Sequence, residues 1–174
     1  MLRLPNLTMS EAKEKINRLE SDTRQLAVHL REIVFAINPE YDDFDEMQAY
    51  FRDTAKHFWA ETDMNLVFDF PKSETKFTVA PDKKRHLLLI FTEIQNNIAK
   101  HAKATQVHLI FKMTSQIHFN LSVQDNGIGF TPLSKNGISK GLSGMKSRAE
   151  SIQATFFIES SERNGTMISI NGAF

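Results

Sequence analysis

Three polar side chains on one predicted helix could together hold a metal–phosphate group. In the segment FTEIQNNIAKHAKA, Glu93, Asn97 and Lys100 are spaced i, i+4 and i+7, so a helix projects them from one side. The amide oxygen of Asn97 is a hard ligand of the kind that Mg²⁺ prefers, and Lys100 can neutralise phosphate charge. Glu93 can accept a proton or position a water. An ordinary solvated helix face has the same composition, so this pattern alone leaves both interpretations open.

A buried carboxylate is predicted where a strand ends, in the segment DNGIGF that starts at Asp125. Asp125 has the register of Leu121 and Val123, so its side chain should point to the covered side of a sheet. A carboxylate there is costly unless a donor reaches it, and the exocyclic amine of adenine is a suitable donor. Gly127 and Gly129 let the backbone pass close to a ligand. The alternative is an ordinary turn after a strand, because Asp-Asn-Gly is good turn chemistry.

A third candidate is the segment KGLSGM, from Lys140 to Met145, which precedes a predicted helix over residues 142–152. Exposed backbone N–H groups at a helix start attract phosphate oxygens. A glycine-containing loop before a helix is also a common structural feature.

The elements that must position these residues form a two-layer domain. An apolar stripe indicates a helix over residues 81–102, and clean alternation indicates strands over 105–113 and 117–125. A β-rich patch begins near residue 66, and two last strands are expected at 155–160 and 166–171. One-sided alternation predicts a sheet with one covered face. We therefore expect an α+β two-layer sandwich, with helices on one face of a mixed, mostly antiparallel sheet.

An α-helical hairpin segment is predicted before this domain. Apolar residues and one threonine alternate at spacings of 3 and 4, as in the seam of a coiled coil or helix bundle. These seam residues are Ile16, Leu19, Thr23, Leu26, Leu30, Ile33 and Ile37. Ser10 can cap the start of the helix, and Asn38-Pro39 ends it. The narrow stripe favours a partner helix over packing on the chain's own domain. A second helix is expected over about residues 44–60.

Bulk composition excludes several classes of function. The 21 basic residues balance 21 acidic ones, so nothing suggests nucleic acid or an anionic membrane as a partner. The sequence has no cysteine, which excludes disulfides, thiolate metal sites and cysteine nucleophiles. The chain has no apolar run of about 18 residues, the length that spans a bilayer. We expect a cytoplasmic domain, whose parent protein could carry a membrane anchor upstream.

The order of the motifs resembles the histidine-kinase branch of the gyrase, heat-shock chaperone and mismatch-repair ATPase (GHKL) superfamily, whose domain is the Bergerat ATP-binding fold. TEIQNNIAKHAKA resembles its N box, DNGIGF and GLSGMKSRAE its two glycine boxes, and NGTMISI its closing Gly-Thr hairpin. The likeness covers residues 64–174. The segment LREIVFAINPEYDDFDEMQAYFRDTAKHF resembles the second dimerisation helix and connection of kinases paired with helix-turn-helix response regulators. The resemblance implies partial dimerisation and linker helices over residues 1–62 and an ATP-binding catalytic domain over 63–174.

The resemblance also implies roles for individual residues, with ATP and Mg²⁺ as the cofactors. Asn97 would coordinate Mg²⁺ and Glu93 would be the acid/base residue, while Asp125 would bind the adenine amine. The other implied ATP-binding residues are Lys100 and His101 near the phosphates, Gly127 and Gly129 around the pocket, Gly141 and Leu142 at the closing edge of a lid over residues 130–140, and Thr166 behind the adenine.

Two departures from the family pattern qualify the implied function. The lid lacks the first glycine of the usual Gly-x-Gly-Leu, because Ser139 stands there. The phosphoacceptor histidine with its following acidic residue is missing, and His29, which flanks the helical seam, is not expected to replace it. We therefore expect the catalytic domain of a two-component sensor histidine kinase. It would transfer the ATP γ-phosphate to a histidine outside this chain, for relay to a response regulator, and its parent protein would be a homodimer. The alternatives are an anti-sigma-factor-like serine kinase of the same superfamily and a non-catalytic nucleotide-sensing dimerisation module.

Overall fold

The structure is a computed structural model that describes residues 8–73, 78–130 and 140–174. The side chain of His29 and residues 131–139, most of the predicted lid, lie outside the described part. The elements, in chain order, are α1 (Met9–Ile37), η1 (Pro39–Asp42), α2 (Phe44–Phe58), β1 (Asn65–Asp69), α3 (Pro81–Asn97), η2 (Ile98–Ala102), β2 (Gln106–Met113), β3 (His118–Asp125), α4 (Lys140–Ser151), β4 (Thr155–Ser160) and β5 (Thr166–Ala173).

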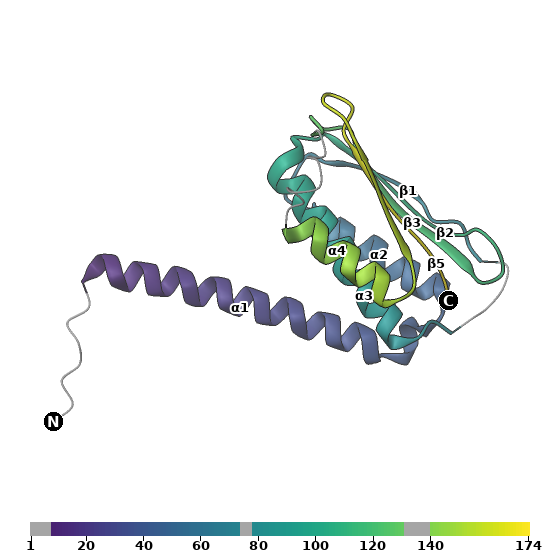
Figure 1. Ribbon diagram of the computed structural model, residues 1–174. Coiled ribbons are helices and arrows are strands. Elements are labelled where there is room, and N and C mark those ends of the chain that lie inside the picture. The colour runs from purple at the N-terminus through teal and green to yellow at the C-terminus, as the bar shows by residue number, and fades with distance from the viewer. Residues whose placement is uncertain (1–7, 74–77, 131–139) are drawn as a thin grey trace.

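The sheet confirms the predicted fold class. Its five strands lie in the order β1-β2-β3-β5-β4, with β1 and β2 parallel and the other neighbours antiparallel. Helices α2, α3 and α4 cover one face (Figure 1). Alternate side chains of β2 and β3 are buried under these helices, as the two-residue period requires. The result is the two-layer α+β sandwich.

Helix α2 packs as part of the helical layer of this domain. Phe51 of α2 lies between Phe91 of α3 and Phe111 of β2, with ring centroids 4.8 and 5.1 Å away. Buried aromatic pairs of this kind contribute through both area and ring geometry. Helix α1 meets α2 at its C-terminal end, where the ring of Phe35 stacks on Tyr50 at 4.1 Å. Packing is therefore continuous across residue 62, and the division into functional segments at that point stays a prediction.

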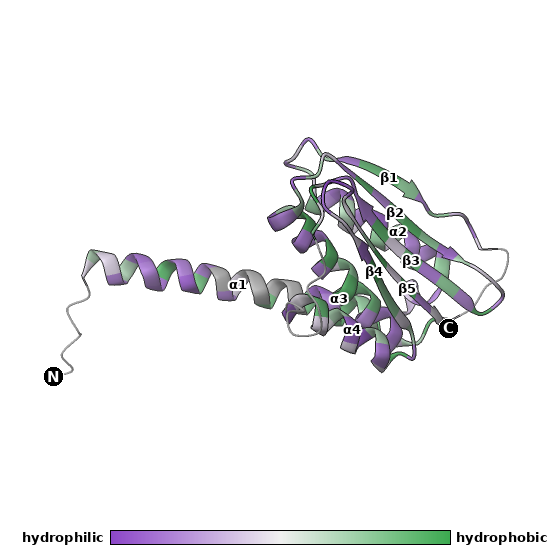
Figure 2. Ribbon diagram, turned by 45° about the horizontal axis from the view of Figure 1, so that its top comes forward, coloured by the Kyte–Doolittle hydropathy of each residue, from purple (hydrophilic) through white to green (hydrophobic). Residues whose placement is uncertain are grey.

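Helix α1 leads away from the domain (Figures 1 and 2). The apolar residues of its seam are exposed to solvent. Its cap is Thr8, which forms a capping box with Glu11, so the prediction of Ser10 as the cap was wrong. The pattern Thr-x-x-Glu satisfies two backbone N–H groups at once, which Ser10 with Lys13 could not do. The helix ends as predicted, with Asn38 as its C-cap and Pro39 opening η1. Among the described residues, no helix is long and apolar enough to cross a membrane.

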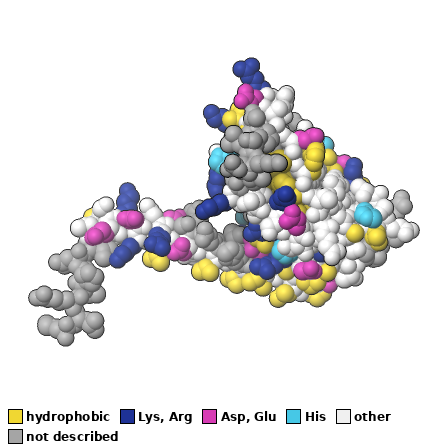
Figure 3. Space-filling view, in the orientation of Figure 1, with side chains coloured by type: hydrophobic (Ala, Val, Ile, Leu, Met, Phe, Trp, Pro, Cys, Tyr) yellow, Lys and Arg dark blue, Asp and Glu magenta, His cyan; other side chains and the backbone are white. Residues whose placement is uncertain are grey.

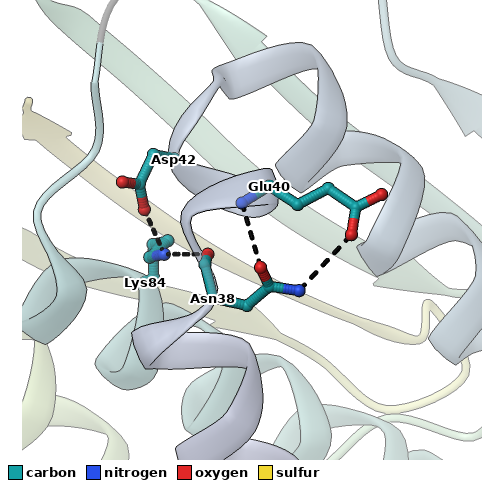
Figure 4. Close-up of polar contacts among 4 residues, drawn as sticks. All are labelled: Asn38, Glu40, Asp42 and Lys84. Carbon is teal, nitrogen blue, oxygen red and sulfur yellow. Dashed lines mark hydrogen bonds and ion pairs between the residues drawn. The ribbon is translucent and has the colours of Figure 1, made fainter.

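A buried lysine joins the end of α1 to the domain (Figure 4). Lys84 of α3 is fully buried, and its ammonium donates to the carbonyl oxygen of Asn38 and to the carboxylate of Asp42. It also lies 5.7 Å from the centre of the Phe35 ring. The side chain of Asn38 accepts a hydrogen bond from the backbone N–H of Glu40 at 3.1 Å. The junction between α1 and α3 is thus held by charge, hydrogen bonds and an aromatic face.

Candidate functional site

The helix that carries the first candidate residues changes its winding where they lie. Glu93 and Asn97 stand in the last turn of α3, and the chain then continues as the π-helical turn η2. Lys100 and His101 belong to η2, and both side chains are exposed. The predicted helix over residues 81–102 is therefore not α-helical throughout. Wider π turns within helices occur frequently at functional sites.

The start of α4 lies directly against Glu93 and Asn97. A Cβ added to Gly141 would collide with Glu93 Oε1 and would lie 3.7 Å from Asn97 Nδ2. The backbone of α4 at Gly141 thus lies against the polar side chains at the end of α3. Helix α4 begins at Lys140, two residues earlier than predicted, so Gly141 and the half-buried Leu142 stand in its first turn. The first turn of a helix directs its unpaired backbone N–H groups outward.

Asp125 has the buried environment that its strand register predicted. It is the last residue of β3 and is 4% exposed. Its Oδ1 accepts a hydrogen bond from the backbone N–H of Gly127 at 2.8 Å. Burial raises the pKa of the Asp125 carboxyl above its ordinary value, against the opposing effect of hydrogen bonds from the backbone N–H groups of Gly127 and Thr166. This carboxylate therefore gains from any ligand group that donates a further hydrogen bond.

Asn126 fixes the turn that follows Asp125, a role that motif comparison did not predict. Its Oδ1 accepts hydrogen bonds from the backbone N–H groups of Thr105 and Gln106, both at 2.9 Å. Its Nδ2 donates to Thr105 Oγ1 at 3.0 Å. One asparagine amide carries both an acceptor oxygen and an NH₂ donor, so a single side chain can make all three bonds. The sequence signal was an asparagine directly after a strand, but its distant partners could not be read from the sequence.

The turn after β3 is also fastened to the end of η2. The backbone N–H of Ile128 donates to the carbonyl oxygen of Ala102 at 2.8 Å. A Cβ on Gly127 would collide with that same oxygen, so a side chain at this position would separate the two segments. The backbone contact between Ala102 and Gly127 thus connects the turn carrying Asp125 with the turn carrying Lys100 and His101.

The turn between β4 and β5 also contacts the turn that follows β3. The backbone N–H of Arg163 donates to the carbonyl oxygen of Ile128 at 2.7 Å. Gly129 and Gly165 have φ angles of +60° and +71°, and a Cβ on Gly165 would collide with the carbonyl oxygen of Asp125. Thr166 follows and pairs directly with Asp125 across the β3–β5 ladder. Directly opposed residues share one face of a sheet, so Thr166 and Asp125 lie side by side.

The structure therefore gathers the predicted residues into two groups. One group is Glu93, Asn97 and Gly141 at the meeting of α3 and α4, and the other is Asp125, Gly127 and Thr166 at the ends of β3 and β5. Among the described residues there is no group of three His, Cys, Asp or Glu side chains that could hold a metal ion. A Mg²⁺ ion that keeps several waters and binds through phosphate oxygens needs few protein ligands, so a single amide oxygen fits it.

Comparison with known proteins gives a consistent result. The chain is 38% identical over 94 residues to the sensor histidine kinase YhcY of Bacillus subtilis, covering 53% of this chain and 24% of that protein. It is 23% identical over 175 residues to the sensor protein NarQ homologue of Haemophilus influenzae, covering 94% of this chain and 31% of that protein. The chain thus spans about a quarter to a third of the length of these curated relatives.

Solved structures show the same fold. The Acinetobacter baumannii histidine kinase AdeS superposes with a TM-score of 0.64 at 13% identity, over 97% of this chain and 86% of that one. Residues 82–171, just over half of the 174-residue chain, match the family described as histidine kinase-, DNA gyrase B-, and HSP90-like ATPase. That range contains Glu93, Asn97, Asp125 and Thr166. The chain belongs to this ATPase family.

Proposed function

We propose that this chain is the ATP-binding catalytic domain of a two-component sensor histidine kinase, and that it transfers the γ-phosphate of ATP to a histidine outside the chain. The observation that carries the proposal is the buried carboxylate of Asp125, held by backbone N–H groups in a turn whose glycine abuts the end of η2. The family match over residues 82–171 supports the nucleotide as ligand. The names of the relatives, sensor histidine kinase and sensor protein, support the signalling role.

Each group of residues has a distinct task in this proposal. Asp125 accepts a hydrogen bond from the adenine amine, with Gly127 and Gly129 shaping the pocket and Thr166 behind the base. Asn97 offers its amide oxygen to Mg²⁺, which would neutralise charge on the triphosphate. Lys100, His101 and the backbone at Gly141 and Leu142 lie toward the phosphates. Glu93 is the acid/base residue or positions a water.

Such a site works mainly by holding its reactants. Phosphoryl transfer requires alignment and charge neutralisation more than covalent participation of the protein. The close approach of Gly141 to Glu93 places the first turn of α4 beside the N-box residues. That arrangement can bring backbone N–H groups and the Asn97 amide to one triphosphate.

A nucleotide-binding measurement tests the proposal most directly. ATP affinity is measured with and without Mg²⁺ for the wild type, Asn97→Ala and Asn96→Ala. We expect Mg²⁺ to strengthen binding in the wild type and in Asn96→Ala, which keeps the proposed ligand. Asn97→Ala should lose most of that gain, because it removes the amide oxygen. Absence of magnesium-dependent binding in the wild type would refute the site.

A transfer assay tests the reaction and separates it from the serine-kinase alternative. The chain is incubated with radiolabelled ATP, alone and with a helical segment that carries an acceptor histidine followed by an acidic residue. We expect label on the added segment and little on the chain itself. The label should be lost in acid, because phosphohistidine is acid-labile, whereas phosphoserine would survive. Acid-stable label would contradict the assignment.

The proposed partners are a second copy of the parent kinase and a response regulator. Hydrophobic side chains run along one side of α1 in the space-filling view (Figure 3). Leu19, Leu26 and Leu30 are each more than 60% exposed. An apolar stripe of this length on a free helix suits a bundle with other helices. The aspartate of a response regulator would then receive the phosphate from the acceptor histidine.

A further inference from the structure

Three residues from neighbouring strands form a row at the purine end of the proposed site. Thr166 of β5 pairs directly with Asp125 of β3 and, on its other side, with Ser160 of β4. Because paired residues share a face, the three side chains lie next to one another on the helix-covered side of the sheet. The proposed function uses Asp125 and Thr166 but leaves Ser160 without a task.

Ser160 is the centre of a small hydrogen-bond cluster. Its hydroxyl accepts a hydrogen bond from the backbone N–H of Phe130 at 2.9 Å and donates to the carbonyl oxygen of Gly165 at 3.1 Å. It also lies 2.9 Å from Thr166 Oγ1. One side chain therefore ties the residue after Gly129 to the turn that precedes Thr166.

The direction of the bond between the two hydroxyls follows from counting protons. A serine hydroxyl has one proton and two acceptor positions. A carbonyl oxygen can only accept, so all three bonds form together only when the proton of Ser160 goes to Gly165. The N–H of Phe130 occupies one acceptor position of Ser160, and the proton of Thr166 satisfies the other. The Thr166 oxygen is then left with lone pairs and no proton for a ligand.

We propose that Ser160 is a positioning residue for purine selection. By drawing the Thr166 proton away, it leaves two neighbouring acceptors, Thr166 Oγ1 and the Asp125 carboxylate, at the base-binding end. Acceptors favour a base edge that donates, such as the 6-amino group of adenine, over the 6-oxo group of inosine or guanine. The inference rests on the proposed function, because it names a determinant of base selectivity at that same site.

The test compares ATP with inosine triphosphate, which carries oxygen in place of the 6-amino group. Binding of both nucleotides is measured for the wild type, Ser160→Ala, Ser160→Thr and Ser161→Ala. Ser160→Ala frees the Thr166 hydroxyl to donate, so the preference for ATP should fall by about tenfold. Ser160→Thr retains the hydroxyl and should restore the preference. Ser161→Ala is the matched control, because among the described residues that hydroxyl accepts one hydrogen bond, from the exposed Asn164 side chain at 2.8 Å.

Specific results of these binding measurements would overturn the proposal. An unchanged ATP preference in Ser160→Ala, or an equal loss in Ser161→Ala, overturns the proposal. If Ser160→Ala does not fold, Thr166→Val removes the oriented hydroxyl instead and should lower the preference to a similar extent. An unchanged ATP preference in Thr166→Val would overturn the proposal equally.

Amide exchange gives a readout that does not depend on nucleotide. The Phe130 amide should exchange faster in Ser160→Ala than in the wild type, because its acceptor is gone, and Ser161→Ala should leave it unchanged. A wild type that binds neither nucleotide would refute the proposed function and purine selection with it. Faster exchange would in that case still establish the contact between Ser160 and Phe130, and unchanged exchange would refute that contact as well.

Discussion

Asp125 shows how a proposed binding residue can oppose the stability of its own fold. Its carboxylate is almost fully buried, and burial raises its pKa even though hydrogen bonds from backbone N–H groups favour the charged form. The folded protein therefore binds this proton more tightly than the unfolded chain does. The contribution to stability is present below the ordinary value of 3.8 and is lost as the pH rises through the raised pKa. The charged carboxylate accepts hydrogen bonds from backbone N–H groups, and a ligand that donates a further bond would stabilise it more.

Asp125→Asn should therefore separate binding from stability. The amide can still accept from the Gly127 N–H, but its NH₂ group opposes the donor of adenine. We expect ATP affinity to fall about 10- to 100-fold. Without nucleotide, we expect the variant to unfold at a higher denaturant concentration than the wild type at pH 7. Near pH 4 the difference between the two proteins should be smaller. Nucleotide titration and denaturant unfolding at both pH values measure this, with the exposed Asp53→Asn as control. Weaker binding together with lower stability would contradict it.

Two buried glutamines offer a matched comparison in the core. Gln95 of α3 is fully buried, and neither polar atom of its side chain has a hydrogen-bond partner within the described structure. Gln48 of α2 is 3% exposed and donates to the carbonyl oxygens of Pro71 and Phe111. Leaving a buried polar group unpaired costs about 1–3 kcal/mol, and removing a satisfied one forfeits its bonds.

The same substitution should thus have opposite signs at the two positions. Gln95→Leu should raise the free energy of unfolding by about 1 kcal/mol, and Gln48→Leu should lower it by about 1–3 kcal/mol. Urea unfolding of both variants beside the wild type gives the comparison. Destabilisation by Gln95→Leu would indicate that an internal water satisfies this amide.

At the scale of elements, α3 extends from the end of α1 to the candidate site. Lys84 near its start binds the junction of α1 and η1, and Glu93 and Asn97 stand in its last turn. A rigid helix transmits a shift at one end to the other more directly than a loop does. The Lys84 ammonium and the Phe35 ring thus attach the end of α1 to the same helix that carries Glu93 and Asn97.

Lys84→Met should destabilise this junction without creating a cavity. Methionine fills similar volume but leaves the Asp42 carboxylate without the ammonium, and the Asn38 carbonyl keeps its bond from the backbone N–H of Tyr41 at 3.2 Å. Because the Asp42 side chain is 33% exposed, we expect a loss of about 1–3 kcal/mol rather than the larger cost of a fully buried pair. Lys83→Met is the control, since Lys83 makes a peripheral bond to the Ala173 carbonyl. Denaturant unfolding measures both, and equal losses would contradict a special role for Lys84.

The sequence predicted the elements better than the contacts between them. Periodicity located the helices and strands because burial of one face sets the spacing of the apolar residues. Strand register was enough to predict that the Asp125 side chain points to the covered face. The cap at Thr8 has a signal in the sequence, because Glu11 three residues later completes a capping box that Ser10 lacks. The π turn at residues 98–102 leaves the apolar spacing nearly unchanged and so gives no signal. The roles of Asn126 and Ser160 depend on strands and turns that meet only after folding.

At the scale of the whole molecule, the seam of α1 exposes apolar side chains to solvent. We expect the chain to self-associate through this seam. Leu19 is 64% exposed, so Leu19→Glu should weaken association while leaving the unfolding of the domain unchanged. Asn17→Glu adds the same charge two residues away, off the seam, and should associate like the wild type. Sedimentation over a range of concentrations distinguishes the variants. A wild type that stays monomeric, or equal weakening by both substitutions, would show that the seam is not a self-association surface in this chain.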